Sequence, residues 1–173
     1  MMMTSIVLTV IGPDKPGLVS AISQKITAGG GNWLDSRMAS LAGHFAGLLQ
    51  VSVPQVKAEA LIASLQELEQ QGLRVVIERG GERTSDGRTL KLALTGQDRP
   101  GIVRDISDVL AYQKINIEEM ETAFFSGSFS GEDMFEMQAT LRVPAELTDT
   151  VLRESIEKLA NNLMVDINLD AAV

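Results

Sequence analysis

The feature that most constrains the fold is a turn that the chain carries twice. The segment TVIGPDKPGLVSAI at residues 9–22 returns as ALTGQDRPGIVRDI at residues 93–106. The shared residues lie 84 positions apart, so that Gly12 corresponds to Gly96. Solenoid repeats are roughly 20–50 residues long, whereas this spacing is the length of a small domain. The sequence therefore predicts two small domains built on the same plan.

The first half alternates strand-like and helix-like segments. Residues 5–11 are β-branched and apolar, which predicts a buried strand. Pro16 suits the first turn of a helix, where its missing N–H costs nothing, and the glycines at 29–31 suit the end of that helix. Two strands, a second helix and a last strand complete a β-α-β-β-α-β order, which is ferredoxin-like. These later elements are expected at residues 32–42, 45–53, 56–71 and 73–78.

The second half repeats this order after GGERTSDGR at residues 80–88, a polar segment that predicts a linker. The clearest strand is 133–143, where apolar and polar residues alternate with a period of two. We expect an α+β protein with ferredoxin-like domains at 1–79 and 89–173, each an antiparallel four-stranded sheet with two helices on one face. The elements of the second domain are expected at residues 90–95, 100–113, 115–125, 133–143, 146–161 and 163–169.

The two halves differ in length at one place. The dipeptide VP at 53–54 corresponds to VP at 143–144, an offset of 90 instead of 84, so six extra residues lie in the second hairpin. The Ser- and Gly-rich segment 126–133 contains them and predicts a longer, mobile loop. The loop is either a binding loop or an insertion without function.

Composition excludes several classes of site. The chain has no cysteine and a single histidine, His44, which excludes disulfides and thiolate metal sites and argues against structural zinc. The net charge is −8, and all of it lies in residues 81–173, because the first 80 residues hold six basic and six acidic residues. Neither half offers the cationic surface that direct binding to nucleic acid requires.

The N-terminal segment MMMTSIVLTV has no basic leader, and no stretch approaches the roughly 20 apolar residues of a membrane span. We expect a soluble, cytoplasmic protein that makes no contact with membranes.

The repeated turn carries a family resemblance. A β-α-β-β-α-β unit whose first turn reads G-x-D-x-P-G-[LI]-V, with Asn32 or Asn116 just after the first helix, resembles the ACT domain, a small regulatory module that senses amino acids. A free-standing pair of such domains is similar to the glycine cleavage system transcriptional repressor family. That resemblance implies a small amino-acid ligand, such as glycine, and repression through a LysR-type transcription regulator without contact with DNA.

The residues of the turn have the parts to bind a zwitterion. A helix N-terminus offers unpaired N–H groups and a partial positive charge to a carboxylate. Asp14 or Asp98, with the side-chain oxygen of Asn32 or Asn116, could accept from an ammonium group. Gly12 and Gly96 are interpreted as letting the chain leave its strand sharply. The candidate ligand-binding residues are Gly12, Asp14, Lys15, Gly17, Leu18 and Asn32 in the first half, and Gly96, Asp98, Arg99, Gly101, Ile102 and Asn116 in the second.

Structural roles for the same residues remain open. An aspartate before a helix is commonly a cap, and the asparagines could bond their own backbone. Lys15 in the first turn corresponds to Arg99 in the second, and this difference is compatible with ligand binding at only one of the two turns. The rival hypothesis is a structural interaction module without a small-molecule ligand. The uncovered sheet face or edge of each domain needs a partner, so a homo-oligomer is expected.

We assign no catalytic residue, metal ligand or cofactor. A small hydrolase using His44 is a minor alternative, since nothing places a nucleophile beside that turn histidine. The glycines at 29–31 end a helix instead of opening one, so they form no phosphate loop. Arg99 lies near the position of an acylphosphatase-like arginine, but the surrounding pattern differs. Glu118, Glu119 and Glu121 are interpreted as part of a solvated strand face. They are not interpreted as a catalytic pair of acids, because neighbours on a strand point to opposite sides.

Overall fold

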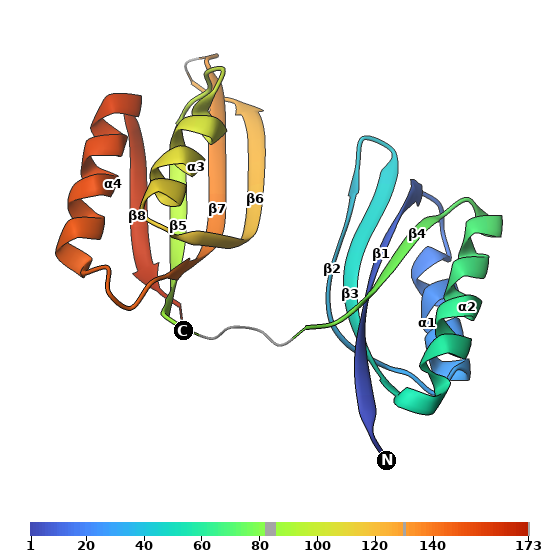
Figure 1. The fold of residues 1–173 in the computed structure, drawn as a ribbon. Coiled ribbons are helices and arrows are strands. Elements are labelled where there is room, and N and C mark those ends of the chain that lie inside the picture. The colour runs from blue at the N-terminus through green and yellow to red at the C-terminus, as the bar shows by residue number, and fades with distance from the viewer. Residues whose placement is uncertain (82–85, 130, 173) are drawn as a thin grey trace. The chain divides into compact units, whose positions relative to one another are not determined.

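The computed structural model describes residues 1–81, 86–129 and 131–172. The chain divides into two compact units, Met1–Arg83 and Thr84–Val173, called here the first and second units. Residues 82–85 of the predicted linker and residue 130 of the predicted loop lie outside the described residues. Each unit has the order β-α-β-β-α-β, with both α-helices on one face of a sheet (Figure 1).

The first unit contains a four-stranded sheet with the order β2-β3-β1-β4, in which all neighbours are antiparallel. Short 3₁₀ turns flank its second helix at Gln55–Lys57 and Glu67–Gln71. The main elements are β1 (Met3–Pro13), α1 (Leu18–Ala28), β2 (Asn32–Leu41), β3 (His44–Pro54), α2 (Ala58–Gln66) and β4 (Arg74–Arg79).

The second unit repeats the topology with the order β6-β7-β5-β8, again antiparallel throughout. The predicted α+β class and the ferredoxin-like fold are therefore confirmed in both halves. The elements are β5 (Arg88–Gln97), α3 (Ile102–Tyr112), β6 (Asn116–Ser126), β7 (Asp133–Val143), α4 (Asp149–Leu163) and β8 (Val165–Ala171).

All four helices differ from the prediction by a few residues at their ends, and two of the helix starts have a clear local reason. Pro16 precedes α1, which begins at Leu18, because Gly17 takes a left-handed conformation with φ of 91° just before the helix. The fourth helix begins at Asp149 instead of residue 146, because the Thr148 hydroxyl accepts a hydrogen bond from the Val151 amide, at 3.4 Å, and caps the helix there.

Each unit has its own apolar core between sheet and helices. In β1, Ile6, Leu8 and Val10 are buried, as the alternation of a one-sided sheet requires. The corresponding strand of the second unit buries Leu92 and Leu94. The helices contribute buried residues spaced mostly by three or four. They are Leu18, Ile22, Ile26, Leu61 and Leu65 in the first core and Ile102, Ile106, Leu110, Leu152, Ile156, Leu159 and Leu163 in the second.

The sheet faces turned away from the helices differ in chemistry. In the first unit this open face carries Ile11, Leu48 and Val76, which are 44%, 50% and 58% exposed. The registers Thr9↔Leu48 and Thr9↔Val76 place these side chains on one side of the sheet. The open face of the second unit carries polar side chains around Lys91, Glu121 and Asp170, and it carries Phe125, 39% exposed and opposite Met134, nearer the Asp98 turn. Within the described part of the chain, no helix has both the length and the apolar character needed to cross a membrane.

Candidate ligand-binding site

The turn after β1 is held in place by three hydrogen bonds. The Asp14 amide donates to the carbonyl oxygen of Gly43, at 3.0 Å, in the tip of the β2–β3 hairpin. The Ser40 hydroxyl donates to Oδ2 of Asp14 at 2.7 Å. On the other side, Nζ of Lys15 donates to the carbonyl oxygen of Gln71 at 2.8 Å. The Asp14 carboxylate is therefore oriented by β2, which is separated from β1 by β3 in the sheet, and it does not cap α1.

The N-terminus of α1 is uncapped and open. Gly17 precedes the helix with φ of 91° and ψ of 0°, no side chain caps the helix, and its first turn contains no acidic residue. A Cβ built on Gly17 would meet no described heavy atom within 4 Å. The first intrahelical bond runs from the Ala21 amide to the Gly17 carbonyl, at 2.9 Å, so the amides of the first turn lack intrahelical partners. These amides can receive an anion.

The second turn has the same backbone but a different surface. The Asp98 amide donates to the carbonyl oxygen of Asp133 at 2.8 Å, and Gly101 has φ of 87°. The first turn of α3 contains Asp105, which accepts from Nη2 of Arg99 at 3.0 Å and from Nε and Nη2 of Arg104 at 3.0 and 2.8 Å. The hydrogen bond to Asp105 raises the pKa of the Arg104 guanidinium. This helix start carries its own ion cluster.

The glycines at the strand ends have a different role from the predicted one. Gly12 and Gly96 lie inside β1 and β5, so neither makes the chain leave its strand sharply. A Cβ on Gly12 would lie 2.6 Å from the carbonyl oxygen of Gly72, and one on Gly96 would lie 2.3 Å from Cγ1 of Val165. Each glycine thus permits the close approach of the chain that enters the last strand of its unit. The freedom of backbone rotation is needed instead at Gly17 and Gly101.

The two asparagines do not join the turn of their own unit. Asn32 pairs with Ser52, which lies opposite Ser5, and Ser5 is nine residues before Asp14 along the strand direction. At about 3.3 Å per residue, that places Asn32 roughly 30 Å from Asp14, at the other end of the sheet. In the second unit, Asn116 pairs with Arg142 and so lies level with the beginning of β5, far from Asp98. Within one unit the grouping of aspartate with asparagine is wrong.

The remaining predicted residues lie at the turns. Leu18 and Ile102 begin the two helices, but their side chains are buried, at 3% exposure each, so only their backbone amides are available for a contact at the turn. Sequence reasoning missed Ser40 and Asp105. Asp105 could have been found as an acidic residue in the first turn of a helix, a position that complements the helix dipole.

The longer hairpin of the second unit borders the Asp98 turn. Where the first unit has a tight tip at Ala42 and Gly43, the second has a loop between β6 and β7 that bonds to itself, with the Gly127 amide donating to the Glu132 carbonyl at 2.8 Å. Figure 1 shows this loop beside the start of α3. Phe129 in the loop is fully exposed. The inserted residues thus lie at the edge of the second turn.

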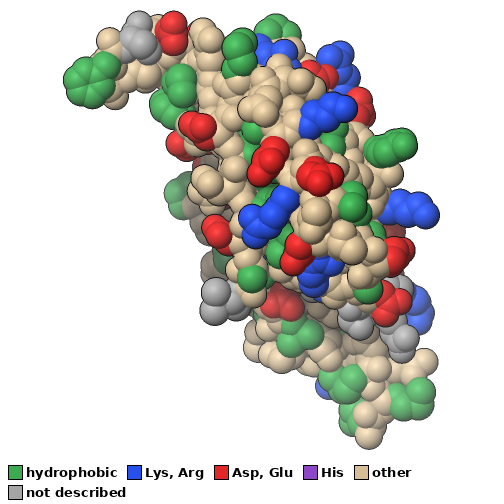
Figure 2. Space-filling model, turned by 90° about the vertical axis from the view of Figure 1, so that its left-hand side faces the viewer, with side chains coloured by type: hydrophobic (Ala, Val, Ile, Leu, Met, Phe, Trp, Pro, Cys, Tyr) green, Lys and Arg blue, Asp and Glu red, His purple; other side chains and the backbone are tan. Residues whose placement is uncertain are grey.

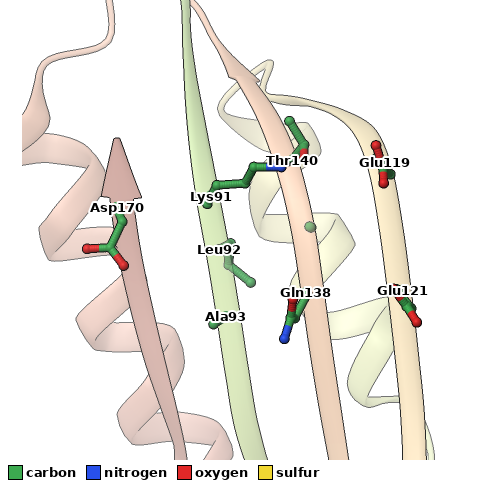
Figure 3. Close-up of a pocket in the computed structure, with 9 residues that line it drawn as sticks. Lys91, Leu92, Ala93, Glu119, Glu121, Gln138, Thr140 and Asp170 are labelled. Carbon is green, nitrogen blue, oxygen red and sulfur yellow. Dashed lines mark hydrogen bonds between the residues drawn. The ribbon is translucent and has the colours of Figure 1, made fainter. Parts of the chain in front are cut away.

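A shallow depression of about 230 Å³ lies on the open face of the second sheet (Figure 3). Lys91, whose Nζ donates to the Thr140 hydroxyl at 2.7 Å, lies on its floor, and Glu121 and Asp170 lie at its sides. Among the described residues, no group of three or more His, Cys, Asp or Glu side chains could hold a metal ion. The depression is a polar surface, about 20 Å along β5 from the Asp98 turn.

The fold and the turns together define a class of protein: a pair of ferredoxin-like domains, each with a first helix that no side chain caps. The model of the ACT domain family matches residues 4–78 and 88–170. The chain belongs to the ACT domain family, and its two units are tandem ACT domains.

Two solved structures match over the whole chain. An unknown protein from Galdieria sulphuraria is 30% identical, with a TM-score of 0.87, and the match covers 99% of this chain and 100% of that one. A protein described, provisionally, as a glycine cleavage system transcriptional repressor is 21% identical, with a TM-score of 0.71, and the match covers 99% of both chains. The second likeness establishes the shared fold. A search of the curated proteins found no match.

Proposed function

We propose that this protein is a regulatory sensor of a small amino acid and has no enzymatic activity. The observation that carries the proposal is the uncapped start of α1, which follows by four residues an aspartate, Asp14, whose carboxylate is oriented by Ser40. The ligand carboxylate would bind the amides that follow Gly17, because they are unpaired and lie at the positive end of the helix dipole. The ligand ammonium would bind Asp14, whose Oδ1 accepts no hydrogen bond from the described residues, while Oδ2 is held by Ser40.

Membership of the ACT domain family supports this proposal, since sensing of amino acids is the role that the resemblance implies. A ligand with a small side chain, such as glycine, suits a site formed by a short turn. Binding would act by linkage: the ligand favours one arrangement of the protein only by its differential affinity for that arrangement.

We further propose that the output is indirect control of transcription in the cytoplasm, through a LysR-type transcription regulator. The shared fold with the provisionally described repressor supports this proposal. So does the charge, because basic and acidic side chains are interspersed on the face viewed from the side of α4 (Figure 2), and a net charge of −8 disfavours direct contact with nucleic acid. The exposed apolar side chains Ile11, Leu48 and Val76 support association into a homo-oligomer.

Calorimetric titration with glycine, L-alanine and L-serine tests the sensor. We expect measurable heat with at least one of them. Asp14→Ala should abolish the signal, and Ser40→Ala should weaken binding by about fivefold, because the lost hydrogen bond is worth about 1 kcal/mol. Asp98→Ala is the matched control in the other turn and should leave this binding unchanged. Absence of heat and of a thermal shift at millimolar concentration of all three amino acids would contradict the proposal.

The apolar open face of the first unit also favours a second candidate function, a structural interaction module without a small-molecule ligand. A pull-down from lysate with and without the amino acid separates the two. A sensor should bind its partner differently in the two conditions, whereas a structural module should bind equally in both.

A further inference from the structure

We propose that Asp105 acts as an internal substitute for the ligand carboxylate in the second unit, so that the protein binds one amino acid per chain, at the turn of the first unit. This inference rests on the proposed function and specifies which of the two repeated turns performs it.

The first step is the ion cluster at the start of α3. The Asp105 carboxylate uses both of its oxygens: Oδ2 accepts from Arg99 at 3.0 Å, and Oδ1 accepts from Arg104 at 2.8 and 3.0 Å. The side chains of Asp105, Arg99 and Arg104 are 30%, 41% and 72% exposed, so solvent screens the contact with Arg99 less than the contact with Arg104. Asp105 therefore already binds one nitrogen of Arg99 and two of Arg104, while the buried Nε of Arg99 has no hydrogen-bond partner among the described residues.

The second step is the position of Arg104. A Cβ built on Gly101 would lie 2.9 Å from Nη2 of Arg104, which means that the guanidinium lies directly over the residue that precedes α3. The same construction on Gly17 meets no described atom within 4 Å. The approach that a ligand needs is thus open in the first unit and covered in the second.

The third step is the sequence at equivalent positions. With the offset of 84, Arg104 and Asp105 correspond to Ser20 and Ala21, so the first unit lacks both the covering cation and the internal anion. A ligand carboxylate entering the second turn would have to compete with the Asp105 carboxylate for the guanidinium groups of Arg99 and Arg104, and would have to displace Arg104 from its position over Gly101. Loss of these charge-assisted hydrogen bonds disfavours binding.

The test combines calorimetry with NMR of the full-length protein, titrated with glycine, L-alanine and L-serine. For the wild type we expect one bound amino acid per chain and a shift of the Gly17 amide resonance, with the Gly101 resonance unmoved. Asp105→Asn, which keeps the shape but removes the charge, should free both arginines and add a second binding event that shifts Gly101. Asp105→Ala, which reproduces Ala21 of the first unit, should do the same.

The reciprocal variant transplants the cluster: Ser20→Arg with Ala21→Asp should weaken binding at the first turn by at least about tenfold, because the introduced carboxylate and guanidinium bind each other over the start of α1 and compete with the ligand. Thermal unfolding checks that each variant is folded. Two equal sites in the wild type, a shift of Gly101 in the wild type, or a single site in both Asp105 variants would overturn this inference and leave the sensor intact. No binding of any of the three amino acids to the wild type would overturn the sensor, and this inference with it.

Discussion

The starts of α1 and α3 share a backbone but differ in their side chains. Gly17 and Gly101 have φ of 91° and 87°, and in both turns the aspartate amide bonds to the neighbouring hairpin. The repeat has kept the residues that set the backbone, while the side chains of the first helical turn have diverged into an open surface and an ion cluster. Similarity of a repeated motif therefore predicts a shared conformation more strongly than a shared ligand.

The open sheet faces of the two units also share a backbone arrangement and differ in their side chains. Ile11, Leu48 and Val76 give the first unit an exposed apolar surface, which is typical of a surface that binds another protein. The second unit has Lys91 and Glu121 on the equivalent face. Phe125, 39% exposed, lies on the same face nearer the Asp98 turn. The two units thus share a fold while their open sheet faces differ in chemistry.

The largest expected effect comes from matched cavities in the two cores. Leu8→Ala and Leu92→Ala remove equivalent buried side chains, 84 residues apart, that belong to separate core clusters. Each should cost about 3 kcal/mol of the free energy of unfolding of its own unit. Urea denaturation followed by NMR of both units measures this. Equal destabilisation of both units by one variant would show that the two cores do not act independently.

A smaller effect is expected at the left-handed glycines. Gly17→Ala and Gly101→Ala place a Cβ where φ is positive, which should cost about 1–2 kcal/mol in each unit. The two costs should be similar, because the atom in the way at Gly101 is the flexible end of Arg104 and can move aside. Chemical denaturation checks the values. A cost at Gly101 several-fold above that at Gly17 would mean that the ion cluster is rigid.

The smallest effect concerns an ion pair between α1 and the 3₁₀ turn that follows α2. Lys25 on α1 donates to Glu67 at 2.8 Å, whereas the equivalent position on α3 is Val109. Lys25→Met should lower the free energy of unfolding of the first unit by less than about 1 kcal/mol, since Glu67 is 61% exposed and the pair is screened. Thermal melts at low and high salt measure this. The difference from wild type should shrink at high salt, and a salt-independent loss would indicate packing of the aliphatic stem instead.

The fold could be predicted from the sequence because it depends on local periodicity. The alternation in β7 and the apolar stripe of α1 each occur within a dozen residues, and the structure has them where the pattern indicated. The misplaced helix starts also have a local cause: whether Gly17 belongs to a helix depends on its φ, which the presence of Pro16 does not determine.

The site was less predictable because it depends on how distant segments meet. Asn32 follows α1, and a crossover helix returns the chain to the end of the sheet from which β1 started, so β2 begins far from Asp14. The topology alone would have shown that Asn32 lies far from Asp14. The contact of Ser40 with Asp14 and the cluster at Asp105 could not have been predicted, because they depend on hairpin register and on the orientation of long side chains.

The hydrogen bond from the Asp14 amide to Gly43 has a consequence for measurement. It ties the residue at the mouth of the first turn to the tip of a hairpin formed by two other strands. Any occupant that tightens the turn must slow deuterium exchange at this single amide and damp the motion of the hairpin tip with it. The exchange rate of the Asp14 amide thus reports in solution whether the turn is occupied, and the measurement needs no partner protein.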